Sequence, residues 1–361
     1  MTRASVVILA AACTASTADE TLSQEEQIAQ YDDLAAELDA GRTLAIDGPA
    51  QDYAEAGGLM AFVDASAGNP VLRAVDAAGA ATNLGIAPYW PGPQGSATDN
   101  INYFSSASII ASMNTIDSVR AYDAATGEEL DELVVPAPPY GQKWWAYAVD
   151  GGDVYVMLIV DGTFRLTRWT PGDPQTTEVL VLDDLVAPNT IGEFTNFAVS
   201  GETLMFYESG RLWIASLDGS PARWTQNDEY VGSVDFRAGE VVYSQGDRIF
   251  RYDRGADARE ELTATIQDGF SLNETFVTIH HPATDTAFVR HEERLYYVAQ
   301  SGIFSFDLGS GAVEPALLDA RDNSVVYRTP SVLSDGTLFV KGLESESGAI
   351  GADGPTWSLR P

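Results

Sequence analysis

Cysteine, histidine and lysine are scarce in this chain, and each shortage narrows the chemistry that the chain can perform. Among its 361 residues there is one cysteine, Cys13, so no disulfide can form within the chain. The three histidines, His280, His281 and His291, are few candidates for the base that activates a serine or cysteine nucleophile. The Gly-x-Ser-x-Gly elbow of many hydrolases is absent from the sequence as well. The sequence therefore favours a protein without a nucleophile–base pair.

Basic residues are also in short supply. Lysine and arginine together number 20 against 53 acidic residues, which gives a net charge of −33, and the only lysines are Lys143 and Lys341. A surface this negative repels phosphate backbones and anionic headgroups, so we expect no nucleic-acid partner. Two interpretations of the acidity stay open. It keeps an exported protein soluble or reflects a saline habitat, or it attracts a cationic partner or Ca²⁺.

Long apolar runs are missing, since no later segment reaches the roughly 18 apolar residues that a membrane-spanning helix needs. Near the start of the chain, the short run Val6–Leu9 follows Arg3, precedes three alanines and leads to Cys13. A positive start, an apolar run and small residues before a cleavage point are typical of a secretory signal. With cysteine at the first mature position, the segment resembles a bacterial lipoprotein signal.

This resemblance implies that residues 1–12 are removed and that Cys13 carries lipid. Thr14 at the following position resembles outer-membrane sorting. The protein would then be an outer-membrane lipoprotein of a bacterial cell envelope, held at the membrane through its N-terminal lipid only. The alternatives are an ordinary signal peptide with a periplasmic or secreted product, or a Cys13 that is a buried thiol.

Residues 13–42 are expected to form a polar tether and one short acidic helix. Ser23-Gln24-Glu25-Glu26 is a capping box, in which the serine and the last glutamate satisfy each other's exposed backbone donors. Apolar side chains then recur at helical spacing, at Ile28, Tyr31, Leu34, Ala35 and Leu38. We expect this stripe to pack against the main domain, and the alternative is a free helix that binds a partner.

From Thr43 onward the pattern changes to short β-strands that end in Gly- or Asp-bearing turns. The third strand of each unit begins at Val71, Ser118, Phe164, Arg211, Arg248, Gly302 and Thr356, with spacings of 47, 46, 47, 37, 54 and 54 residues. Four antiparallel strands in about 40–50 residues are typical of a propeller blade. Residues 43–361 are therefore predicted to form an all-β, seven-bladed β-propeller of four-stranded antiparallel blades. Six blades is the alternative, if the weak first unit, Leu59–Leu84, is irregular.

The last unit stops one strand short, because the chain ends at Pro361 just after Thr356–Leu359. An unpaired sheet edge is a liability, and propellers avoid it when the two chain ends share one blade. The run Thr43–Ile46 is the natural donor of the missing outer strand. We therefore predict a mixed closing blade.

These units resemble the bacterial propeller superfamily that includes YVTN-type, TolB-type and PQQ-type repeats. The segment Ala121–Leu130, which reads AYDAATGEEL, is similar to the PQQ-propeller repeat, where such a turn precedes a docking tryptophan. Asp131 stands where that tryptophan would be. The resemblance therefore implies the architecture and no quinone, and no cofactor is expected.

The connections between units are the long ones, and in a propeller they lie together on one face. They are Ile86–Asn100, Pro136–Lys143, Asp183–Thr195 and Thr265–Asp285. Long loops on a rigid scaffold are where binding residues concentrate. Aromatic and histidine side chains in and beside these loops are the candidate binding residues: Tyr89, Trp90, Tyr140, Trp144, Phe270, His280 and His281. The alternative for these rings is packing over the channel mouth or blade edges, favoured for Trp144 because it adjoins a strand.

Two functions remain open at this point, with non-catalytic binding of a protein or glycan favoured. The alternative is a Ca²⁺-assisted hydrolase or lactonase-like enzyme, with acids from several blades converging at the channel mouth. No EF-hand-like spacing of acids supports it. His291-Glu292-Glu293-Arg294 begins like a metalloprotease motif, but it lacks the second histidine and is expected to be a strand turn.

Overall fold

The computed structural model of the protein describes most of the chain after the tether. It covers residues 23–47, 50–64, 71–84, 103–105, 108–115, 118–134, 146–160, 163–181, 194–208, 211–219, 223–224, 231–237, 240–245, 248–253, 255–256, 258–262, 288–299, 302–320, 324–344 and 355–360. The statements below concern these residues.

The predicted acidic helix is present as α2, Gln24–Asp39, and it begins at the predicted capping box. The Glu26 amide donates to the Ser23 hydroxyl at 3.3 Å, and the Ser23 amide donates to the Glu26 carboxylate at 2.8 Å. These bonds lower the pKa of Glu26. No helix among the described residues has the length and apolar character needed to cross a bilayer.

All other regular elements are strands, which pair into seven four-stranded antiparallel sheets. The first three complete sheets comprise β2 Ala50–Ala56, β3 Leu59–Asp64, β4 Val71–Val75 and β5 Ala81–Asn83; β6 Tyr103–Ser105, β7 Ile109–Thr115, β8 Ser118–Asp123 and β9 Glu129–Val134; and β10 Ala146–Asp150, β11 Asp153–Val160, β12 Thr163–Trp169 and β13 Thr176–Val181.

The remaining sheets follow the same plan, apart from the last, which contains both ends of the described chain. They comprise β14 Phe194–Ser200, β15 Thr203–Glu208, β16 Arg211–Ser216 and β17 Arg223–Trp224; β18 Val231–Arg237, β19 Glu240–Gln245, β20 Arg248–Asp253 and β21 Ala258–Glu261; β22 Phe288–His291, β23 Arg294–Ala299, β24 Gly302–Asp307 and β25 Val313–Leu318; and β26 Val325–Val332, β27 Leu338–Glu344, β28 Thr356–Leu359 and β1 Thr43–Ile46.

The strand order β26-β27-β28-β1 confirms the predicted donor strand. Thr43 pairs with Ser358, Leu44 with Trp357 and Ile46 with Thr356, and the register shifts between Leu44 and Ile46. We call this the closing sheet. Six of the seven predicted third strands begin at the predicted residue, and β12 begins one residue earlier, at Thr163.

The first unit is more regular than its sequence suggests. The weak stretch Leu59–Leu84 belongs to a complete sheet whose inner strand, β2, lies before it at Ala50–Ala56. That strand carries Gln51, Asp52 and Glu55, which hide its strand pattern in the sequence. The irregularity on which the six-unit alternative depended is therefore not found in this sheet.

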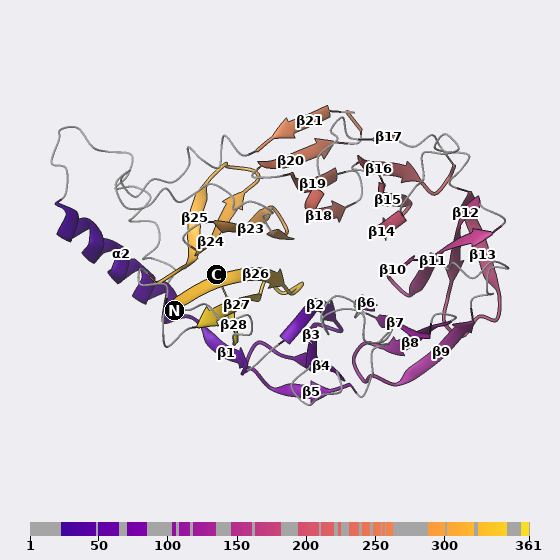
Figure 1. Cartoon of the computed structure of the whole chain (residues 1–361), viewed down its shortest axis with the longest axis horizontal. Coiled ribbons are helices and arrows are strands. Elements are labelled where there is room, and N and C mark those ends of the chain that lie inside the picture. Colours follow the sequence, from indigo (N-terminus) through magenta and orange to yellow (C-terminus); the bar gives the residue numbers. More distant parts are fainter. Residues whose placement is uncertain are drawn as a thin grey trace.

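The sheets follow one another around a common centre, with the first strand of each sheet innermost (Figure 1). Each inner strand contacts the inner strand of the next sheet, in the order β2, β6, β10, β14, β18, β22 and β26, and β26 contacts β2. This arrangement is propeller-like, with β1 and α2 at the outer side of the closing sheet.

The hydrophobic core lies between the sheets rather than at their centre. Each of seven buried clusters joins two consecutive sheets. One example packs Val119 against Val156 and Trp169. The cluster of Ala45, Phe62 and Phe339 joins the closing sheet to the sheet of β2–β5. Burial of apolar surface therefore links the last sheet to the first as it links the others.

The recurring Asp-and-Gly phrase forms the turn between the third and fourth strands. In the turn after β8, Asp123 Oδ1 accepts from the amides of Ala125 at 3.0 Å and Thr126 at 2.8 Å. Gly127 has a φ of +73°, and a Cβ there would collide with the Leu84 backbone. The turn after β24 repeats the pattern at Asp307 and Ser310. Turn chemistry and close packing thus account for these residues.

Candidate functional site

The residues predicted to bind a partner lie outside the described part of the chain. They are Cys13, Tyr89, Trp90, Tyr140, Trp144, Phe270, His280 and His281. The predicted long loops also fall there, except that Phe194 and Thr195 open β14. Their roles stay predictions.

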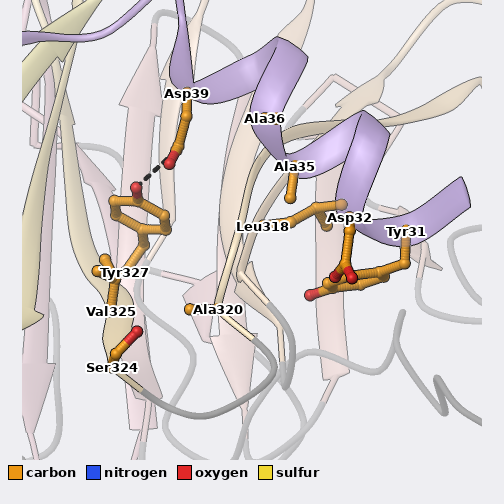
Figure 2. A pocket seen from close by; sticks show the side chains of 10 residues that line it. All are labelled: Tyr31, Asp32, Ala35, Ala36, Asp39, Leu318, Ala320, Ser324, Val325 and Tyr327. Atoms are coloured by element: carbon orange, nitrogen blue, oxygen red, sulfur yellow. Dashed lines mark hydrogen bonds between the residues drawn. The ribbon is translucent and has the colours of Figure 1, made fainter. Parts of the chain in front are cut away.

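Within the described residues, a pocket of about 490 Å³ lies between α2 and the start of the closing sheet (Figure 2). The connection from β25 to β26 forms its floor. It is lined by Tyr31, Asp32, Ala35, Ala36, Asp39, Leu318, Ala320, Ser324, Val325 and Tyr327. The sequence pattern did not indicate this pocket, because its two walls come from opposite ends of the chain.

The predicted apolar stripe holds α2 in place. Tyr31 is buried, and Leu34, Ala35 and Leu38 pack against the same cluster, which includes Phe304 and Leu318. The Tyr31 hydroxyl donates to the Asp319 carbonyl at 2.7 Å. The prediction that this helix packs against the main domain is therefore confirmed.

A set of polar and aromatic contacts, which we call the clasp, secures the C-terminal end of α2. It comprises Asp39, Arg42, Tyr327, Trp357 and Gly342. The Tyr327 hydroxyl donates to Asp39 Oδ1 at 2.7 Å and accepts from Arg42. Burial, together with the bond to Asp39, raises the pKa of the Tyr327 phenol, so this hydroxyl stays protonated and remains a donor.

Aromatic packing completes the clasp. The Arg42 guanidinium lies 4.5 Å from the centre of the Trp357 ring and 5.7 Å from that of Tyr327. The two rings meet edge to face at 5.8 Å. Trp357 lies so close to Gly342 that a Cβ at that position would overlap the indole. The clasp therefore joins the end of α2 to β26, β27 and β28.

The electrostatics of the pocket are one-sided. Asp32 and Asp39 are its only charged lining residues, and none of the ten is basic. Asp32 is exposed, whereas Asp39 lies 3.6 Å from Arg42 and accepts from Tyr327. Tyr31, Tyr327, Leu318 and the alanines supply apolar walls. The pocket thus presents negative charge at the rim of a largely apolar hollow.

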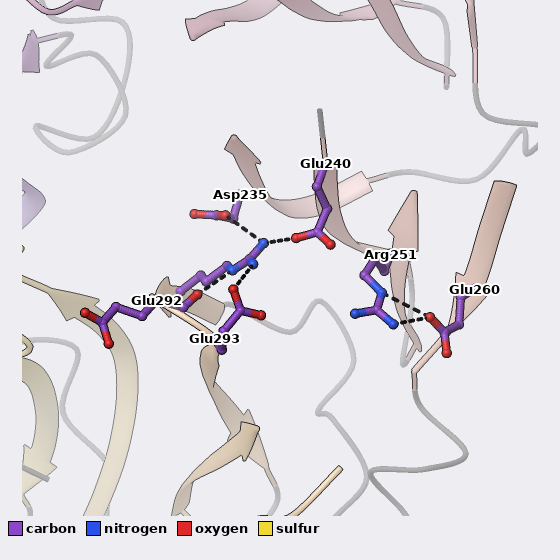
Figure 3. Close-up of polar contacts among 7 residues, drawn as sticks. Asp235, Glu240, Arg251, Glu260, Glu292 and Glu293 are labelled. Atoms are coloured by element: carbon purple, nitrogen blue, oxygen red, sulfur yellow. Dashed lines mark hydrogen bonds and ion pairs between the residues drawn. The ribbon is translucent and has the colours of Figure 1, made fainter. Parts of the chain in front are cut away.

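A second charged cluster links two other sheets (Figure 3). The Arg290 side chain is 5% exposed, pairs with Glu240, and lies 3.9 Å from Asp235 and 3.4 Å from Glu293. Its Nε also donates to the Glu292 carbonyl at 2.8 Å. Figure 3 places Asp235 and Glu240 on one side of the cluster and Glu292 and Glu293 on the other. Arg290 therefore holds β22 to the β18–β19 hairpin.

This cluster explains the His291–Arg294 segment. Glu292 and Glu293 form the turn between β22 and β23, as predicted, and Glu292 has a φ of +50°. The surrounding segment fixes that unusual conformation through the Arg290 bond to the Glu292 carbonyl. Across the described ranges, no three histidine, cysteine or acidic side chains are grouped to hold a metal ion.

No protein-family model and no characterised protein sequence matches this chain. Solved structures do match. Oligogalacturonate lyase from Vibrio parahaemolyticus superposes with a TM-score of 0.54 at 10% identity, covering 88% of this chain and 91% of that one. The Cps50 (Swd1) β-propeller domain of Myceliophteria thermophila superposes with a TM-score of 0.51 at 14% identity, covering 86% and 98%.

A third similar structure is the extracellular domain of the hybrid two-component system BT4673 from B. thetaiotaomicron. It has a TM-score of 0.49 and 8% identity, and the match covers 86% of this chain but 38% of that longer chain. At such low identities the similarity concerns the fold alone. The lyase and the Cps50 domain support a β-propeller architecture for this chain.

Proposed function

We propose that this chain is an exported seven-bladed β-propeller that acts as a non-catalytic binding module. The observation that carries the proposal is the closing sheet, in which β1 pairs with β28. Seven clusters between consecutive sheets, including one between the last and the first, support seven blades in a closed ring. A closed ring is a rigid scaffold on which loops of any sequence can be displayed.

The binding face is the one that carries the connections between blades. Because all seven sheets share one strand order, every connection from an outer strand to the next inner strand leaves by the same face. Tyr89, Trp90, Tyr140, Phe270, His280 and His281 belong to such connections, and Trp144 adjoins one of them. Their rings offer large apolar faces with polar tips, which suit a protein or glycan partner.

The N-terminal segment adds an anchor to this module. In our proposal, Cys13 carries lipid after the signal is removed, and the polar residues up to Ser23 connect the lipid to α2. The docked helix then fixes the tether to one edge of the propeller, beside the closing sheet. This places the protein in a bacterial cell envelope, with the loop face available to a partner.

The experiment compares binding by three forms of the full chain on a glycan array and by cross-linking in isolated envelopes. The forms are the wild type, a Trp90→Ala/Tyr140→Ala variant, and a Leu130→Ala/Val134→Ala control in the outer strand β9. Leu130 and Val134 are 47% and 67% exposed, so their loss tests non-specific apolar contact. We expect the loop variant to lose about tenfold or more in affinity and the control to lose less than about twofold. Equal binding by all three forms would overturn the proposed face.

The calcium-assisted hydrolase remains the alternative, and melting experiments separate it from the binding module. Calcium that bound folded acids with millimolar affinity or better would raise the melting temperature, because ligand binding stabilises the folded state. The binding module predicts the same melting temperature in millimolar Ca²⁺ and in chelator. A calcium-dependent rise of several degrees would favour the hydrolase instead.

A further inference from the structure

We propose that the pocket beneath α2 binds an organic cation, a primary ammonium or guanidinium group carried on a compact apolar body. The site lies among described residues and does not depend on the loop-face partner proposed above. Its volume of about 490 Å³ is within the range of pockets that hold small molecules.

Charge is the first reason for a cation. The lining carries two carboxylates, Asp32 and Asp39, and no basic side chain. The base that follows the helix, Arg42, lies over the rings of Trp357 and Tyr327 instead of lining the pocket. A ligand ammonium therefore meets negative potential there, reinforced at long range by the net charge of −33.

The arrangement of the walls is the second reason. Figure 2 shows Asp32 beside the Tyr31 ring at one end and Asp39 joined to Tyr327 at the other, with Ala35 and Leu318 between them. Asp39 already accepts from Tyr327 and pairs with Arg42. Asp32 is exposed, and its carboxylate is the one we assign to the ligand cation. The apolar body would then lie along the alanines and Leu318.

The third reason is that the pocket has rigid supports. The Tyr31 hydroxyl is fixed to the Asp319 carbonyl, and the Tyr327 amide is fixed to the Asp319 carboxylate at 2.7 Å. Asp319 thus holds both pocket tyrosines from beneath. Preformed walls lower the ordering cost of binding a small ligand.

The test measures binding of 2-phenylethylamine, of its neutral analogue 2-phenylethanol, and of an acetylated Ala-Lys-Ala amide by calorimetry on the full chain. The two cationic probes distinguish a free amine from a lysine side chain of a partner protein. We expect at least one of them to bind about tenfold more tightly than the alcohol, and to weaken as salt is added. Equal binding of amine and alcohol, or no binding of either cation, would overturn the proposal.

Matched variants assign the binding to this pocket. Asp32→Asn should reduce the affinity for the cation about tenfold, whereas Asp33→Asn, an exposed neighbour that does not line the pocket, should change it less than about twofold. Ala36→Leu narrows the pocket without removing charge and should also weaken binding, whereas Ala29→Leu on the same helix should not. Equal affinities for Asp32→Asn and Asp33→Asn would place the cation elsewhere.

Discussion

The sheet of β10–β13 and the closing sheet share one strand order but are built from different parts of the chain. The first uses residues 146–181 in sequence, and its β10–β11 pairing runs without a register shift. The closing sheet takes β1 from the other end of the chain, and the β1–β28 pairing contains a shift. Local hairpins close at low entropic cost, whereas joining distant segments costs more.

The difference shows why extra contacts surround β1. With a single cysteine in the chain, a disulfide cannot secure the junction. Instead the clasp joins the end of α2 to three strands of the closing sheet, and Ser358 Oγ donates to the Ala77 carbonyl at 2.7 Å. Side-chain contacts around β1 therefore do what short hairpins do in the sheet of β10–β13.

The largest expected effect separates the two sheets through a pair of glycines. Gly342→Ala places a methyl group into the Trp357 ring and should destabilise the fold by roughly 3 kcal/mol. Gly152→Ala, in the β10–β11 turn, meets nothing within 4 Å and should change stability by less than about 0.5 kcal/mol. Urea unfolding measures both. Similar losses for the two variants would remove the distinction between the sheets.

The next comparison concerns two ion pairs. Arg42→Ala removes the stacking on Trp357 and the bond to Tyr327, and should cost roughly 1–2 kcal/mol. Glu178→Gln breaks the exposed pair with Arg165, which joins β12 and β13 at 2.7 Å, and should cost less than about 0.5 kcal/mol. The midpoint of urea unfolding reports each. An Arg42 effect no larger than that of Glu178 would show that the clasp does not stabilise the closing sheet.

Two buried tyrosines sharpen the same point. Tyr327 has hydrogen-bond partners at Asp39 and Arg42, whereas the Tyr297 hydroxyl has none among the described residues. Tyr327→Phe should therefore cost about 1 kcal/mol, and Tyr297→Phe should be neutral or slightly stabilising. Thermal melting of the two variants checks this. A clear loss for Tyr297→Phe would reveal a partner for that hydroxyl and contradict the expectation.

The smallest effect is an acid dependence that both kinds of sheet share. Hydrogen bonds from Ser310 lower the pKa of Asp307, and bonds from Thr337 lower the pKa of Asp335 in the closing sheet. Such carboxyls stabilise the fold above their unfolded pKa of about 4, and this stabilisation is lost as the pH falls through the lower folded value.

Asp307→Asn and Asp335→Asn should therefore each flatten the fall in the urea midpoint between about pH 5 and pH 2. Both side chains are largely exposed, so salt should weaken the effect in both variants. An unchanged pH profile in either variant would show that its turn bonds do not shift the carboxyl in solution.

Local features of the chain were predictable from the sequence. The capping box at Ser23, the apolar stripe of α2, six third-strand starts and the donor strand Thr43–Ile46 all follow from short-range pattern. These succeed because alternation, turn residues and caps act over a few neighbours.

Features made by distant segments were not predictable. The pocket beneath α2 joins Asp32 to Val325, and the Arg290 cluster joins three acids from two sheets. No spacing in the sequence encodes such meetings, because they depend on how the sheets pack. The strand β2 was missed for a local reason, since Gln51, Asp52 and Glu55 interrupt its apolar alternation.

Amide hydrogen exchange across Thr43–Ile46 tests the central claim most directly, that β1 completes the closing sheet. Paired amides of β1 should exchange about a hundredfold or more slowly than in an unstructured peptide, and at rates close to those of the outer strand β13. Arg42→Ala should speed exchange in β1 and leave β13 unchanged. Unprotected β1 amides, beside protected amides in β27 and β28, would contradict the account.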